Sequence, residues 1–305
     1  MTKSQPMKPG KIHFIAMLIA ASALLSAFVP GKTKPIKTPE GFVFIPMGTT
    51  NIDTDTFFVQ AFWISKTEVT NKEYREFLAD LKASGDMDAY QKALPDTTQW
   101  RDKLAYNEPY VELYFRHPAY AEYPVVNISR EQAEMYCVWL TKKMREAYGE
   151  NINDVRLPYR EEWVLAAMGH NPEAVYPWKG VTLFNEKEHK YACNFRNMGA
   201  ESVHYNDSTG KMEVWGKYGS CGIAGSINDA ADITAPALSY WPNDYGLYNM
   251  AGNVAEMVQQ SGIVVGGSWK STGYDVRIES TAPYYGPRSD VGFRPVITYT
   301  GTIKK

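Results

Sequence analysis

The chain has 305 residues, 44% of them hydrophobic, and a formal net charge of −2 at pH 7, a size that fits one large domain or two small ones. Its composition excludes collagen-like, low-complexity and wholly disordered chains. Because the charge is nearly balanced, no bulk positive field would draw the protein onto nucleic acid, which is not expected as a partner.

The amino-terminal segment is typical of a targeting sequence. Three lysines precede an apolar run over residues 12–29, as in the charged and hydrophobic regions of a signal peptide. The run is close to the ~18-residue lower limit for a membrane span, so an uncleaved signal anchor is the alternative and would be the only membrane contact. We predict this signal segment at residues 1–29, a Pro- and Lys-rich linker at 30–40 and one domain at 41–300.

The first half of the domain carries the clearest secondary-structure signals. Two β-rich runs, residues 41–46 and 57–64, are expected to form an opening hairpin. Capping boxes at Thr70–Glu73 and Ser129–Gln132 predict the first turns of two amphipathic helices, and residues 151–170 should contain a third.

Beyond residue 171 helical periodicity gives way to Gly, Asn, Pro and aromatic residues. Short β-like pieces remain, such as residues 263–269 and 292–299. The sequence therefore predicts an α+β domain with little regular secondary structure.

The three cysteines, Cys137, Cys193 and Cys221, show no spacing typical of a zinc site. Cys137 lies on the apolar stripe of the second helix and is interpreted as a core residue. In an oxidising compartment an odd number of thiols leaves one free or paired between chains, and Cys193 with Cys221 is the expected bridge.

Nine short strings follow one another along the chain. They are GFVFIP (41–46), KTEVTN (66–71), YPVV (123–126), RLP (156–158), EW (162–163), YPW (176–178), YGLYNMAGN (245–253), GGSW (266–269) and GFR (292–294). In this order they resemble the formylglycine-generating enzyme (sulfatase-modifying factor) family, and they cover about residues 41–297. The resemblance implies a single loop-rich α+β domain of the sulfatase-modifying-factor type, distantly like C-type lectins.

One of these strings predicts a cation site on chemical grounds. Residues 249–256 place an amide oxygen, backbone carbonyls and a carboxylate in one tight loop, an all-oxygen set that a hard cation such as Ca²⁺ prefers. In the family this loop holds calcium, and the resemblance assigns Asn249 and Glu256 as side-chain ligands and Gly252 and Val254 as backbone ligands. The alternative is that Asn249 and Glu256 only cap turns.

A second calcium site is implied by the resemblance alone. Its ligands would fall on Asn194, Phe195, Asp229 and Ala231. The loop between these positions diverges from the family pattern.

The chain departs from the family at the position of its chemistry. Family enzymes oxidise a target cysteine with a copper ion held by two thiols shortly after the Gly-Gly-Ser-aromatic string. In this chain the two positions hold Ser271 and Val276. A hydroxyl is a hard donor and valine has none, so we expect neither copper nor copper–thiolate oxidation, and the site is interpreted as degenerate.

The stretch from residue 94 to 126 resembles the insertion of gliding-motility lipoproteins of the type IX secretion apparatus, which also lack the oxidase thiols. Its aromatic and Pro-rich surface at about residues 86–122 has a composition that protein interfaces favour. The alternative is that the rings pack the insertion onto the domain; both are expected, for different rings. They are Tyr106, Tyr110, Tyr114, Phe115 and Tyr120.

The leading hypothesis is an exported, non-catalytic protein of the periplasm or outer membrane that binds a protein partner in the cell envelope, within a gliding-motility or type IX secretion assembly. The first alternative is an enzyme with a thiol-independent reaction, using Arg277, Glu279, Tyr284 or Arg288. The second is a Ca²⁺-dependent peptide or carbohydrate binder, which rests on fold analogy.

Overall fold

The computed structural model describes residues 34–35, 37–103, 105–185, 188–196, 203–214 and 231–303. It has two compact units, of which the larger comprises residues 37–300. In the smaller unit, β1 (Lys34–Pro35) pairs with β16 (Thr302–Ile303). The predicted signal segment at residues 1–29 lies outside the described residues, within which no helix is long and apolar enough to cross a membrane.

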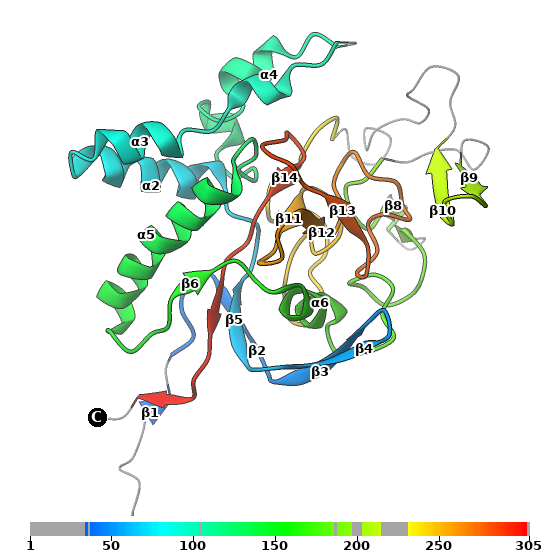
Figure 1. Cartoon of the computed structure of the whole chain (residues 1–305), viewed down its shortest axis with the longest axis horizontal. Helices are drawn as coiled ribbons and strands as arrows, with labels where there is room; N and C mark the ends of the chain where they lie inside the picture. The colour runs from blue at the N-terminus through cyan, green and yellow to red at the C-terminus, as the bar shows by residue number, and fades with distance from the viewer. Residues whose placement is uncertain are drawn as a thin grey trace, which may run out of the picture. The chain divides into compact units, whose positions relative to one another are not determined.

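The first four-stranded sheet of the larger unit joins residues from both ends of the domain (Figure 1). Its antiparallel order is β2 (Phe42–Ile45), β5 (Phe62–Ser65), β15 (Val296–Thr298) and β6 (Val155–Arg156). The predicted pairing of the two opening runs is present, with Phe42 opposite Ser65.

The run at residues 57–64 is nevertheless two strands. Its first part belongs to β4 (Asp55–Val59), which forms a separate hairpin with β3 (Gly48–Ile52). Three consecutive residues of β5 are buried, whereas burial along β4 is confined to Val59. The chain therefore passes at residue 60 from a half-exposed hairpin to a strand covered on both faces.

The second four-stranded sheet has the order β13 (Thr281–Pro283), β12 (Ile263–Val265), β11 (Ala255–Met257) and β14 (Val291–Gly292). The strand expected at 263–269 ends at Val265 because Gly266 and Gly267 have φ values of 80° and 65°, outside the β region. The run at 292–299 is also divided. It leaves β14, passes through Phe293, Arg294 and Pro295, and enters β15 of the other sheet.

The three predicted helices are confirmed as α2 (Asn71–Ala83), α5 (Arg130–Tyr148) and α6 (Arg160–Met168). Both predicted capping boxes form, at Thr70 and at Ser129. Figure 1 shows α2, α3 (Met87–Ala93) and α5 together on one side of the unit, with α6 beneath the second sheet. Cys137 is buried on α5, as expected of a core residue.

Helical turns that the sequence did not predict occur in the insertion. They are α3, η1 (Thr97–Trp100), α4 (Glu108–Leu113) and η2 (Pro118–Tyr120). The remaining described strands form two hairpins, β7 (Phe184–Asn185) with β8 (Lys190–Tyr191) and β9 (Val203–Asn206) with β10 (Lys211–Val214). Short elements linked by long loops confirm the predicted α+β, loop-rich class.

Candidate functional site

The two positions to which the resemblance assigns copper thiols, Ser271 and Val276, hold residues with structural roles. The Ser271 hydroxyl accepts a hydrogen bond from the Ser268 backbone amide at 2.9 Å. This bond closes the turn that follows β12. Val276 is 0% exposed and packs in a cluster with Tyr176, Cys193, Phe195 and Ala251. The side chain of Ser271 offers a hard hydroxyl oxygen and that of Val276 has no donor atom, so neither position supplies a soft metal ligand.

Cys193 is the thiol of that same apolar cluster. It is buried and free, so the expected bridge is not formed at Cys193, and Cys221 lies outside the described residues. Burial raises the pKa of the Cys193 thiol well above its ordinary value. Since the thiolate is the form that binds metals and attacks substrates, the buried neutral thiol has a packing role.

The four polar residues named for a thiol-independent reaction all have partners within the fold. Arg277 pairs with Glu279 at 3.1 Å, the Tyr284 hydroxyl donates to the Ile128 carbonyl at 3.0 Å, and Arg288 pairs with Asp290 at 2.6 Å. These contacts are those of turns and strand ends, and none of them joins a nucleophile to a base.

The structure does place a lysine beside a hydroxyl, which the sequence analysis missed. The Lys270 ammonium donates to Ser289 Oγ at 2.8 Å and lies 4.8 Å from the centre of the Trp269 ring. Ser289 is 3% exposed, so its oxygen is not presented to a substrate. The pair secures the loop before β14 to the Gly-Gly-Ser-Trp string.

The predicted calcium loop is held in a tight left-handed path. Asn249, Gly252 and Asn253 have φ values of 51°, 72° and 62°. A Cβ at Gly252 would lie 2.2 Å from the Asn194 carbonyl oxygen, so only glycine fits where the loop passes Asn194. The Asn253 amide donates to that same carbonyl at 2.8 Å.

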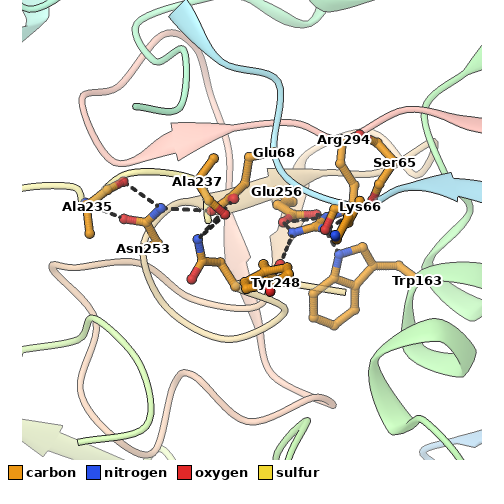
Figure 2. A network of polar contacts seen from close by, with 11 residues as sticks. Ser65, Lys66, Glu68, Trp163, Ala235, Ala237, Tyr248, Asn253, Glu256 and Arg294 are labelled. Atoms are coloured by element: carbon orange, nitrogen blue, oxygen red, sulfur yellow. Dashed lines mark hydrogen bonds and ion pairs between the residues drawn. The ribbon is translucent and has the colours of Figure 1, made fainter. Parts of the chain in front are cut away.

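Glu256 at the end of this loop forms a buried ion pair with Arg294, as Figure 2 shows. Arg294 Nη2 donates to Oε1 at 2.6 Å, and Nε lies 2.9 Å from Oε1 and 2.8 Å from Oε2. The indole of Trp163 on α6 donates to Oε2 at 2.8 Å. Both oxygens of the carboxylate are therefore used by protein donors.

The guanidinium of Arg294 also binds three backbone carbonyls (Figure 2). Its Nη2 donates to Tyr248 at 2.8 Å, and its Nη1 donates to Ser65 at 3.2 Å and to Lys66 at 3.3 Å. Residues of β5, β11, α6 and the loop before Asn249 thus meet around the Arg294–Glu256 ion pair. A second residue outside the predicted set, Glu68, lies next to it.

Glu68 is fully buried and accepts hydrogen bonds from the side-chain amides of Asn253 at 2.9 Å and Asn249 at 3.2 Å. Burial raises its pKa from the ordinary 4.5 to about 7; the positive charge of Arg294 opposes this shift and the negative charge of Glu256 adds to it. One buried guanidinium thus faces two carboxyl groups, of which Glu256 is its direct partner.

The residues of the first predicted calcium site fit the cation in part. The buried side-chain oxygen of Asn249 has no hydrogen-bond partner, as a ligand position requires. The carboxylate of Glu256, by contrast, already accepts from Arg294 and Trp163. The carboxyl group that contacts Asn249 is that of Glu68.

The residues of the second predicted site are divided. Asn194 lies next to the first loop, where its Nδ2 is 3.4 Å from Asn253 Oδ1 and its own buried Oδ1 is without a partner. Phe195 is part of the apolar cluster around Val276. Ala231 begins a described segment, and Asp229 lies outside the described residues. Across the described part of the chain, no three His, Cys, Asp or Glu side chains gather as a metal-binding group.

Comparison with known proteins identifies the family. The model of the Sulfatase-modifying factor enzyme 1-like domain (FGE-sulfatase) matches residues 29–299, and the chain belongs to this family. Inactive C-alpha-formylglycine-generating enzyme 2 of Bos taurus is 27% identical over 70% of this chain and 67% of its own length. Formylglycine-generating enzyme of Thermomonospora curvata is 32% identical over 44% of this chain and 32% of its own length. The chain therefore spans between a third and two thirds of these relatives.

Solved structures show the same fold. PvdO from Pseudomonas aeruginosa has a TM-score of 0.53 and 19% identity, with 87% of this chain and 98% of that chain covered. Treponema denticola variable protein 1 has a TM-score of 0.52 and 17% identity, with 88% and 99% covered. At these identities the likeness concerns the fold alone.

Replacing Glu256 by Gln should lower the free energy of unfolding by about 3–5 kcal/mol, because Arg294 would keep a buried charge without its partner. Chemical denaturation is to be measured with excess Ca²⁺ and with EDTA. The ion pair does not depend on a cation, so the loss should be the same in both. Glu279→Gln, which removes an exposed ion pair, is the control and should cost less than about 1 kcal/mol. Equal stabilities of wild type and Glu256→Gln in EDTA, together with a loss in excess Ca²⁺, would instead make Glu256 a calcium ligand.

Glu68 should make the protein less stable as pH rises. The folded state holds the Glu68 proton up to about pH 7, whereas the unfolded state releases it near its ordinary pKa of 4.5. The contribution of Glu68 to the free energy of unfolding is therefore complete below pH 4.5 and lost by about pH 7. The free energy of unfolding should fall by an amount on the order of 3 kcal/mol between these pH values. Denaturation in EDTA between these limits should give wild type a more negative slope of stability against pH than Glu68→Gln. Identical slopes would contradict the prediction.

Proposed function

We propose that this protein is an exported, non-catalytic member of the family that binds a protein partner in the cell envelope, within a gliding-motility or type IX secretion assembly. The observation that carries the non-catalytic part is Val276, fully buried by apolar neighbours at a position where an oxidase needs a thiol. The match to inactive relatives of Bos taurus and Mus musculus is consistent with this reading.

The insertion supports the partner-binding part. Its buried rings fix it to the domain, since Trp100 and Tyr114 pack together at 4.7 Å and Trp100 stacks on Trp269 at 6.3 Å. Its outer surface leaves Tyr106 83% exposed and Leu113 43% exposed. Most of the predicted rings therefore have packing roles, and Tyr106 is the ring available to a partner.

A cavity of about 430 Å³ lies between this insertion and the degenerate site. Its lining includes the rings of Tyr110 and Trp269, and its charged groups are balanced, with Arg196 and Lys270 against Asp102 and Asp232. Aromatic rings next to charged groups of both signs suit a peptide segment with aromatic and polar side chains. We propose this cavity and Tyr106 as the partner-binding region.

Structural calcium at the two predicted sites is a further part of the proposal. The unpartnered buried amide oxygen of Asn249 supports the first site and that of Asn194 supports the second, because oxygen donors suit this hard cation. When bound, each ion would tie together loops that regular secondary structure does not. Glu256 serves Arg294 in the geometry described above, which leaves the amide oxygens as the side-chain donors.

The purified protein should not convert the cysteine of a sulfatase-type peptide to formylglycine when supplied with copper, because Ser271 and Val276 hold no thiolate. Mass spectrometry of the peptide checks this. The enzyme of Thermomonospora curvata assayed in parallel is the positive control. Thiol-to-aldehyde conversion by this protein would overturn the non-catalytic assignment.

Affinity capture from a native envelope extract should recover secretion or motility components with the wild-type chain, and several-fold less with Tyr106→Ala. The reason is the loss of an exposed aromatic anchor at the rim of the insertion. Tyr285→Ala is a matched control, since Tyr285 is 93% exposed on the loop after β13, outside the insertion. Equal recovery with all three chains would exclude Tyr106 from the interface.

A further inference from the structure

We infer that α5 forms a symmetric antiparallel contact with α5 of a second copy of this chain, centred on Val138. The surface concerned is a groove of about 370 Å³ between α2 and α5, called here the α5 groove. Its walls are apolar and its rim is charged. The lining residues used below are Phe77 and Leu81 of α2 and Glu131, Met135, Val138 and Lys142 of α5.

The first observation is an apolar centre without a partner within the chain. Val138 is 61% exposed, although it lies in the middle of a 19-residue helix. Met135 and Leu81 are half-buried beside it. An exposed aliphatic side chain over an apolar groove is the arrangement in which one helix can insert a side chain into another.

The second observation is the order of charges along the exposed face. Glu131 and Glu134 precede Val138 by seven and four residues, and Lys142 and Arg145 follow it by four and seven residues. All four lie on the same side of the helix as Val138, because 3.6 residues complete one turn. The face is therefore acidic in its first half and basic in its second half.

A two-fold axis at Val138 converts this order into complementarity. In an antiparallel pair, the residue n places before Val138 lies at the same height as the residue n places after Val138 in the other copy. At a rise of about 1.5 Å per residue, the acidic and basic groups would meet at about 6 Å and about 10 Å on either side of the centre. A parallel pair would instead bring acid against acid and base against base.

Acidic residues near the start of a helix and basic residues near its end also interact favourably with the helix dipole. The order of charges alone could therefore be explained within one chain. The groove and the exposed Val138 are independent of the dipole. Moreover, among the ion pairs of the described residues, Glu134 pairs with Arg130 and Arg145 with Asp154, whereas Glu131 and Lys142 pair with no other residue. In the antiparallel pair Glu131 would face Arg145 and Lys142 would face Glu134 of the second copy, so each of these two charges would gain a partner there.

The test measures the oligomeric state of the purified full chain by sedimentation velocity from about 1 to about 100 μM. Wild type should form a dimer. Glu134→Lys and Lys142→Glu should each raise the dissociation constant at least about tenfold, because Glu134 of one copy faces Lys142 of the other and each change brings like charges together. The variant that carries both changes restores this pair with its signs exchanged and should dimerise to within about threefold of wild type. Glu150→Lys makes the same charge change at an exposed position after α5 and should have no effect.

A monomer at every concentration would overturn the inference and leave the α5 groove to a helix of another protein. A dimer that tolerates both single variants would place the contact on another surface. Loss of dimerisation without rescue in the double variant would exclude the antiparallel arrangement. This inference is independent of the proposed partner at Tyr106, since the affinity capture above uses a different surface.

Discussion

The arrangement of the larger unit depends on one buried charge, the guanidinium of Arg294. The chain reaches Arg294 where it leaves β14 of one sheet and before it enters β15 of the other. At this point five hydrogen-bond donors are withdrawn from water together with a positive charge, which costs several kcal/mol unless every donor is satisfied. Glu256 supplies the opposite charge, and the carbonyls of Ser65, Lys66 and Tyr248 accept the remaining bonds.

This interaction explains how long loops keep fixed positions in a domain whose strands are short. A bidentate guanidinium–carboxylate pair has a fixed planar geometry, so it sets the direction of β11 relative to the crossover at Arg294. Trp163 extends the constraint to α6, because its indole donates to the same carboxylate. The Asn249 loop, which lies between Tyr248 and Glu256, is consequently held at both ends. Its tight left-handed path is compatible with that restraint, since Gly252 and two asparagines accept positive φ.

Local signals in the sequence were sufficient for the elements that carry their own boundary chemistry. The capping boxes at Thr70 and Ser129 predicted two helices correctly because cap residues act within one turn. Runs of β-forming residues did not reveal that the chain changes sheet at residue 60 and at Arg294, since the partner strands lie far away in sequence. Arg294, Glu68 and Asn253 each stood in a recognised string, yet their contacts join residues up to 229 positions apart. A string identifies a position as part of the family pattern. It does not show which residues of another string that position contacts in the fold.

The same separation explains how residues 271 and 276 could vary within this fold without disturbing its core. The Arg294 network includes neither Ser271 nor Val276, so changes at those positions leave the charge balance of the core intact. A thiol at a dry position would have to be deprotonated to bind a metal, whereas valine packs there against Tyr176 and Cys193. Val276 thereby stabilises the apolar cluster next to the Gly-Gly-Ser-Trp string. Under the proposed function, a surface fixed by such packing suits the binding of another protein, because little conformational freedom has to be lost when the complex forms.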